Sequence, residues 1–64
     1  MIKINGILLD IPASTLAEYL KTTTYQPHLI AVELNGEIVP KAKYGETVLK
    51  DGDVIEIVSF VGGG

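Results

Sequence analysis

Two Asn-Gly dipeptides, each set between runs of alternating apolar residues, are the feature that most restricts how this chain can fold. An Asn-Gly pair supplies the two positive-φ residues of a type I′ turn, the tightest connection between antiparallel strands. The pattern therefore predicts two antiparallel hairpins. Asn5-Gly6 joins residues 1–5 to 7–11, and Asn35-Gly36 joins 29–34 to 37–40.

A single short helix is predicted between the two hairpins. Thr15 and Glu18 fit a capping box, in which the Thr15 side chain caps the first turn and the Glu18 side chain reaches back to the backbone. Leu16 and Leu20 lie one turn apart, so both should face the core. The β-branched run at 22–24 should end the helix after about two to three turns.

Residues 54–61 are expected to form the longest strand. They are apolar on nearly both faces, which is typical of a central strand with a neighbour on each side and a helix over one face. Residues 41–48 are interpreted as an irregular connection. Because one helix covers one face of a sheet, this order predicts an α+β domain in which a mixed sheet of four to five strands packs on one helix. The side chains expected on the helix side are Ile2, Ile4, Leu9, Ile11, Leu16, Leu20, Val32, Leu34, Ile55 and Ile57.

The opposite face of the sheet is predicted to be uncovered, with Val54, Glu56, Val58 and Phe60 from the last strand and Leu8 from the first hairpin. Single exposed apolar residues are common and need no explanation. Val58 and Phe60, however, lie close to the end of the sequence, where the chain becomes rich in glycine. This position favours a partner-docking patch made of Leu8, Val58 and Phe60.

The glycines at the end of the sequence are the candidate reactive segment. Gly62, Gly63 and Gly64 follow the last strand directly, so we expect a domain at 1–61 and a flexible tail at 62–64. Glycine has no Cβ, so such a tail can enter a narrow channel in another protein, where the Gly64 carbonyl carbon is open to attack. A frayed end or a linker has the same composition, and the tail alone leaves both interpretations open.

Composition excludes several classes of function. With 64 residues the chain forms one domain. Its net charge of −3 disfavours nucleic acid as a partner and favours proteins with basic surfaces. The sequence contains no cysteine, so no side chain of this chain can act as a thiolate nucleophile or thiolate metal ligand. Because no apolar run reaches the roughly 18 residues of a membrane span, we expect a cytoplasmic protein that does not contact a membrane.

The polar residues form no recognisable catalytic or metal-binding pattern. His28 is the only histidine and has no second ligand or nucleophile at useful spacing. Asp51, Asp53 and Glu56 could suggest a cation site, but turn formation explains the two aspartates, and Glu56 belongs to a solvated strand face. The serines and threonines lack a general base with an orienting partner. We therefore predict no metal site and no catalytic residue.

Four segments of the sequence, taken together, match one known family. They are Thr15-Leu16-Ala17-Glu18-Tyr19-Leu20, Ala31-Val32-Glu33-Leu34-Asn35-Gly36-Glu37-Ile38-Val39-Pro40, Asp51-Gly52-Asp53-Val54-Ile55 and the terminal Gly63-Gly64. In this combination and at this length, the chain resembles the ThiS family of sulfur carriers in thiamine biosynthesis. The resemblance implies a ubiquitin-like β-grasp fold. Gly62 departs from the family, which usually carries a small or apolar residue at that position.

The resemblance also implies a mechanism that begins at the Gly64 carboxylate. An adenylating, E1-like partner enzyme would use ATP to form a Gly64 acyl-adenylate. Sulfur from a persulfide, supplied by a sulfur-donating enzyme, would displace AMP and leave a thiocarboxylate. Thiazole synthase would then take this sulfur to build the thiazole ring of thiamine. On this reading the chain is a protein cosubstrate and not an enzyme. It binds no cofactor, and the partner enzyme uses the ATP.

Three other functions stay open. The small subunit of molybdopterin synthase shares the fold and the thiocarboxylate chemistry, but it is usually longer and remains bound to a large catalytic subunit. A ubiquitin-like protein modifier would join Gly64 to lysines after the same activation. A TGS-like ligand- or RNA-binding module would leave the glycines without a role, and the net negative charge also weighs against it.

Overall fold

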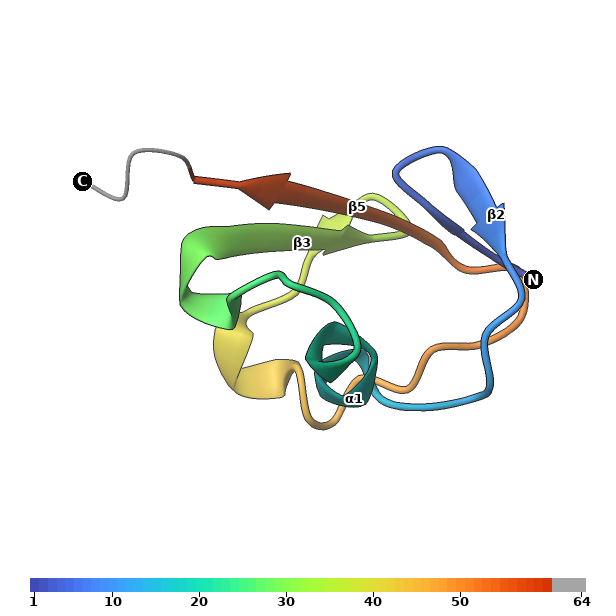
Figure 1. The fold of residues 1–64 in the computed structure, drawn as a ribbon, viewed down its shortest axis with the longest axis horizontal. Coiled ribbons are helices and arrows are strands. Elements are labelled where there is room, and N and C mark those ends of the chain that lie inside the picture. The colour runs from blue at the N-terminus through green and yellow to red at the C-terminus, as the bar shows by residue number, and fades with distance from the viewer. Residues whose placement is uncertain (61–64) are drawn as a thin grey trace.

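The computed structural model describes residues 1–60 and contains a five-stranded mixed sheet that packs on one short helix (Figure 1). Strands β1 (Ile2–Ile4) and β2 (Ile7–Leu9) form the first hairpin, and β3 (Ile30–Leu34) and β4 (Glu37–Ile38) form the second. Strand β5 (Val54–Ser59) lies between the hairpins, in the order β2-β1-β5-β3-β4. It runs parallel to β1 and antiparallel to β3. The predicted α+β architecture with a central last strand is confirmed.

Both hairpins turn at the predicted Asn-Gly pairs. Asn5 and Asn35 have φ angles of 51° and 52°, and the glycines that follow them have φ angles of 83° and 88°. Positive φ at both central residues is what a type I′ turn requires.

The first hairpin is shorter than the alternation of its residues suggested. Strand β2 ends at Leu9, which pairs with Ile2, and does not continue to Ile11. Beyond this pair, the Met1 carbonyl accepts a hydrogen bond from the Gly52 amide at 2.8 Å. Met1 therefore bonds to the turn before β5 and not to a longer β2. The strand prediction for residues 7–11 was therefore too long.

Helix α1 (Leu16–Lys21) begins at the predicted capping box. The Glu18 amide donates to the Thr15 hydroxyl at 3.1 Å, and the Thr15 amide donates to the Glu18 carboxylate at 3.0 Å. With six residues the helix has fewer than two turns, so the predicted length was too great. The hydroxyls of Thr22 and Thr23 each donate to a carbonyl of the last turn at 2.7 Å, and these local bonds compete with helix continuation. No helix within residues 1–60 is long and apolar enough to cross a membrane.

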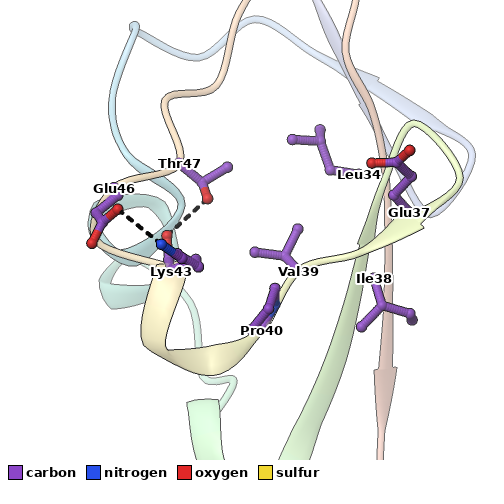
Figure 2. A pocket seen from close by; sticks show the side chains of 8 residues that line it. All are labelled: Leu34, Glu37, Ile38, Val39, Pro40, Lys43, Glu46 and Thr47. Atoms are coloured by element: carbon purple, nitrogen blue, oxygen red, sulfur yellow. Dashed lines mark hydrogen bonds and ion pairs between the residues drawn. The ribbon is translucent and has the colours of Figure 1, made fainter.

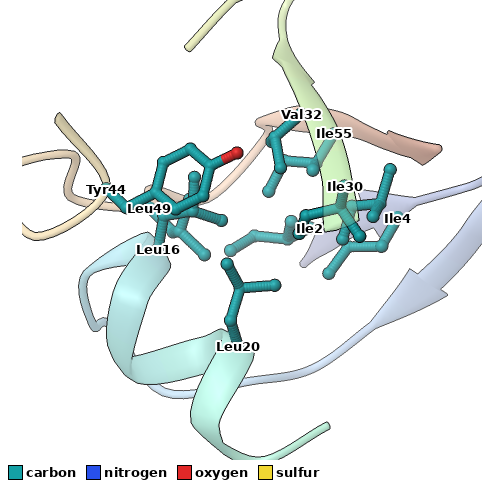
Figure 3. Close-up of a cluster of buried hydrophobic side chains, with 10 residues drawn as sticks. Ile2, Ile4, Leu16, Leu20, Ile30, Val32, Tyr44, Leu49 and Ile55 are labelled. Atoms are coloured by element: carbon teal, nitrogen blue, oxygen red, sulfur yellow. The ribbon is translucent and has the colours of Figure 1, made fainter. Parts of the chain in front are cut away.

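The hydrophobic core lies between α1 and one face of the sheet (Figure 3). All ten side chains predicted to face the helix are found there: seven are buried, and Leu9, Ile11 and Leu34 are partly buried against them. The buried residues are Ile2, Ile4, Leu16, Leu20, Ile30, Val32, Tyr44, Leu49, Ile55 and Ile57.

Tyr44 and Leu49 show that the connection before β5 is part of the core. This segment contains the short 3-10 helix η2 (Lys41–Lys43), and a second one, η1 (Pro27–Leu29), precedes β3. The carbonyls of Tyr44 and Thr47 accept hydrogen bonds from the first amides of α1, at 3.0 and 2.7 Å. Because these amides have no partner within the helix, the segment caps α1 while it buries its own side chains. The prediction of an irregular connection missed this packing.

Candidate functional site

The face of the sheet that is turned away from α1 carries the predicted docking residues. Leu8, Val58 and Phe60 are 60, 59 and 55% exposed, and no element of residues 1–60 covers this face (Figure 1). Val58 belongs to β5, and Phe60 follows directly after it. Leu8 lies at the opposite end, because it pairs with Lys3, which in turn pairs with Val54. Four residues along a strand separate Val54 from Val58, which is about 13 Å.

Two further apolar side chains on this face were not assigned to the docking patch from the sequence. Ile38 is 63% exposed and Val54 is 41% exposed. Ile38 pairs with Glu33 across the β3–β4 hairpin, so the two side chains share a face. A two-residue turn at Asn35-Gly36 fixes this pairing. Because Glu33 is expected on the solvent side, the exposure of Ile38 could have been predicted from the sequence. We call Leu8, Ile38, Val54, Val58 and Phe60 the open apolar face.

The side chain of Asn5 holds the middle of β5 in place. The Ile57 amide donates to Asn5 Oδ1 at 2.7 Å, and Asn5 Nδ2 donates to the Ile57 carbonyl at 3.2 Å. The Asn5 amide also donates to the Ile55 carbonyl at 2.9 Å. The asparagine amide therefore imitates a peptide group and extends the β1–β5 pairing past the end of β1.

Asn35 makes a similar contact at the start of β5. The Val54 amide donates to Asn35 Oδ1 at 2.9 Å, and Asn35 Nδ2 donates to Asp53 Oδ1 at 3.1 Å. At the other end, the Phe60 amide donates to the Leu29 carbonyl at 2.7 Å. Hydrogen bonds to neighbouring segments are thus found both at Val54, the first residue of β5, and at Phe60, the last residue described. The sequence predicted only the positive φ of the two asparagines, because these contacts join residues far apart in the chain.

The predicted reactive residues Gly62, Gly63 and Gly64 lie outside the described residues. So does Val61, the last residue of the predicted strand at 54–61; the strand is observed as Val54–Ser59. The structure therefore describes the chain up to Phe60, the residue that directly precedes the predicted end of the domain at residue 61.

Asp51 and Asp53 both lie at the predicted turn, and the turn role is confirmed for the Asp53 side chain. The Asp51 carboxylate accepts a hydrogen bond from the N-terminal ammonium group of Met1, and this bond together with the positive charge lowers the pKa of Asp51. Asp53 Oδ2 accepts from the Lys50 amide at 2.8 Å. Within residues 1–60 there is no group of three or more side chains that could hold a metal ion.

A surface depression of about 300 Å³ lies between β4 and η2 (Figure 2). Three of its polar residues interact with one another: Lys43 Nζ is 3.6 Å from a Glu46 carboxylate oxygen, and the Thr47 hydroxyl donates to the Lys43 backbone carbonyl at 2.8 Å. None of its lining residues is buried, so it does not provide the enclosed polar groups that orient a small ligand. The lining residues are Leu34, Glu37, Ile38, Val39, Pro40, Lys43, Glu46 and Thr47.

Comparison with known proteins identifies the family. The sequence model of the ThiS family matches residues 2–64. The chain belongs to the ThiS family. It is 39% identical to the sulfur carrier protein ThiS of Bacillus subtilis, and the match covers 100% of both chains. The crystal structure of the thiamine biosynthesis protein ThiS from Geobacter metallireducens is 33% identical, with a TM-score of 0.78 over 98% of this chain and 97% of that one. The expected ThiS resemblance and ubiquitin-like β-grasp fold are confirmed.

This ThiS-family chain is also similar to part of a larger protein. It is 44% identical to a thiazole synthase of Paramagnetospirillum magneticum over 62 residues. That match covers 95% of this chain but only 19% of the relative. The chain therefore spans about a fifth of the length of this relative.

Proposed function

We propose that this ThiS-family chain carries sulfur as a thiocarboxylate on Gly64 and donates it for thiazole formation. The broader assignment, a sulfur carrier of thiamine biosynthesis, is supported by the full-length similarity to the sulfur carrier protein of Bacillus subtilis. We assign the modification to the carboxyl group of Gly64 because this residue stands at the end of the glycine run.

The chemistry requires activation of the Gly64 carboxylate by another protein. A carboxylate is a poor electrophile, so the adenylating, E1-like partner spends ATP to form an acyl-adenylate and pyrophosphate. The outer sulfur of a persulfide on the sulfur-donating enzyme then attacks the carbonyl carbon, AMP leaves, and an acyl disulfide forms. A second thiol of the partner system attacks the donor's sulfur, so that the S–S bond breaks, a disulfide forms on the partner side, and the thiocarboxylate is released. The final thiocarboxylate bears a nucleophilic sulfur. In this scheme the chain is a cosubstrate without an active site, it acts in the cytoplasm, and ATP is bound by the partner.

Thiazole synthase is the acceptor in this scheme. Relatives named thiazole synthase, from Paramagnetospirillum magneticum and Magnetococcus marinus, include a segment 44% and 41% identical to this chain. A carrier-like segment within the same polypeptide as a thiazole synthase supports a direct encounter between carrier and enzyme. The open apolar face and the end of β5 are the part of this chain that would meet it.

Intact-mass measurement tests the proposal. The chain is incubated with ATP, its cognate adenylating enzyme and a sulfur donor, and a sulfur-for-oxygen gain confined to the C-terminal peptide is expected. An unchanged mass in the presence of an active enzyme would contradict the carrier function. A matched variant that lacks Gly63 and Gly64 should gain no sulfur. Adducts that join Gly64 to lysines of cellular proteins would instead identify a protein modifier.

A further inference from the structure

Two glutamates lie directly opposite each other on the open apolar face. Glu33 of β3 pairs with Glu56 of β5, and both side chains are exposed. Like charges at directly opposite positions of an antiparallel pair destabilise the sheet. Opposite charges or apolar pairs at such positions stabilise a sheet, whereas this pair adds a small repulsion to the isolated chain.

No cation of the described residues neutralises this pair. Within residues 1–60 the ion pairs are Met1 with Asp51 and Lys43 with Glu46. Lys3 is on the same face, but its cross-strand partner is Val54, and it forms no ion pair with either glutamate. None of the side-chain hydrogen bonds within residues 1–60 involves the Glu33 or the Glu56 carboxylate.

Apolar side chains surround the acidic pair. Ile38 pairs with Glu33 on one side, and Val54 and Val58 flank Glu56 along β5. These three side chains are 63, 41 and 59% exposed. A partner that covers them would remove water from the carboxylates, and two desolvated negative charges without a cation would be costly.

We propose that the Glu33–Glu56 pair receives an arginine side chain of thiazole synthase when that enzyme covers the open apolar face. A guanidinium group is planar, can donate to two carboxylates at once and is weakly hydrated, so it suits a small acidic site within an apolar contact better than lysine. A second copy of this chain fits less well, because its own acidic pair would repel this one. The inference rests on the proposed function, since that function supplies the partner.

The inference is tested by titration of the purified, unmodified chain with its cognate thiazole synthase. Glu33→Gln and Glu56→Gln should each weaken binding by about tenfold or more, because each would leave a buried guanidinium with one carboxylate. Both variants should also weaken the dependence of binding on salt concentration. Glu37→Gln is the matched control: Glu37 pairs with Leu34 and so points to the other side of the sheet.

The same variants should melt slightly higher than the natural chain, by about 1–3 °C at low salt, because removal of one charge relieves the repulsion. This gain in stability together with a loss of binding separates a docking role from a structural one. A lower melting temperature for Glu56→Gln would show that the carboxylate already has a partner within the chain, and would overturn the inference.

Three binding results would also overturn the inference. The first is a change of less than twofold in the affinity of both variants for thiazole synthase, and the second is an equal loss of affinity in Glu37→Gln. The third is a loss of affinity for the adenylating enzyme while affinity for thiazole synthase is unchanged. Self-association that disappears in Glu56→Gln would assign the face to a second copy and likewise contradict the inference. The titration needs neither ATP nor sulfur, so its result is independent of the mass measurement. The variants can bind normally while Gly64 gains sulfur, or bind weakly while Gly64 gains none, and the two proposals can therefore be contradicted separately.

Discussion

Removal of the Asn5 side-chain amide should destabilise the fold more than a substitution in an exposed turn normally does. The residue itself is exposed, but its two hydrogen bonds to Ile57 are partly buried and lie within the central strand. Each such bond contributes about 0.5–1.5 kcal/mol net, so the pair is worth about 1–3 kcal/mol. Asn5→Gly keeps the positive φ at low cost and should lose this amount.

Asn5→Ala should lose more, because alanine must adopt the φ of 51° that asparagine and glycine tolerate. This adds about 1 kcal/mol, for a total of about 2–4 kcal/mol. A chain of this size is expected to have a free energy of unfolding of only about 3–10 kcal/mol. The alanine variant should therefore lose a large fraction of the stability of the fold, and the glycine variant a smaller fraction.

Urea unfolding at 25 °C, followed by circular dichroism, measures these differences. Asn35→Gly is the matched control, since Asn35 has the same turn position and φ but its two hydrogen bonds are exposed. It should lose about 0.5–1.5 kcal/mol. The reasoning would be refuted if Asn5→Gly were as stable as the natural chain, or if Asn35→Gly lost more than Asn5→Gly.

Three further predictions concern packing, docking and pH. Leu49→Ala should lower the free energy of unfolding by about 2–5 kcal/mol in urea titrations, because Leu49 is 1% exposed. The control Val48→Ala, at a 51% exposed position, should lower it by less than about 0.5 kcal/mol. Phe60→Asp should weaken binding of partner enzymes in titration calorimetry but leave the melting temperature nearly unchanged; equal affinity would argue against the docking patch. Asp51→Asn should lower the melting temperature slightly at pH 7, and this difference should shrink as the pH falls below 3.8. The pKa of Asp51 is lowered, so the contact with the N-terminal ammonium stabilises the fold above the ordinary pKa of 3.8 and is lost as the pH falls through the folded value. A melting difference that does not change with pH would contradict this last assignment.

Local sequence signals predicted the hairpins, the helix start and ten side chains that pack in or against the core, seven of which are buried. They succeeded because turn geometry, capping and strand alternation depend on residues a few positions apart. Tyr44 and Leu49 escaped prediction because their burial depends on hydrogen bonds between the 44–49 segment and the start of α1, which are distant in sequence. The bonds from Asn5 to Ile57 span 52 residues and have no local signature.

The candidate site was predicted in part. Strand alternation correctly placed Leu8, Val58 and Phe60 on the exposed side, since it fixes which side chains share a face. The pairing of Glu33 with Glu56 could not be predicted from strand alternation. It depends on the register between β3 and β5, and 19 residues separate these strands. The roles of Gly62, Gly63 and Gly64 remain predictions for the mass and deletion experiments.

The place of β5 in the sheet has a consequence for biosynthesis. The two hairpins do not pair with each other; each pairs with β5, the last strand within residues 1–60. A growing chain can form the hairpins early, but its sheet closes only after Ser59 has been made. The surface that combines β3 with β5, including the acidic pair, is therefore absent from chains whose synthesis has not reached β5. An enzyme that recognises this surface would bind chains that contain β5 and ignore those that lack it.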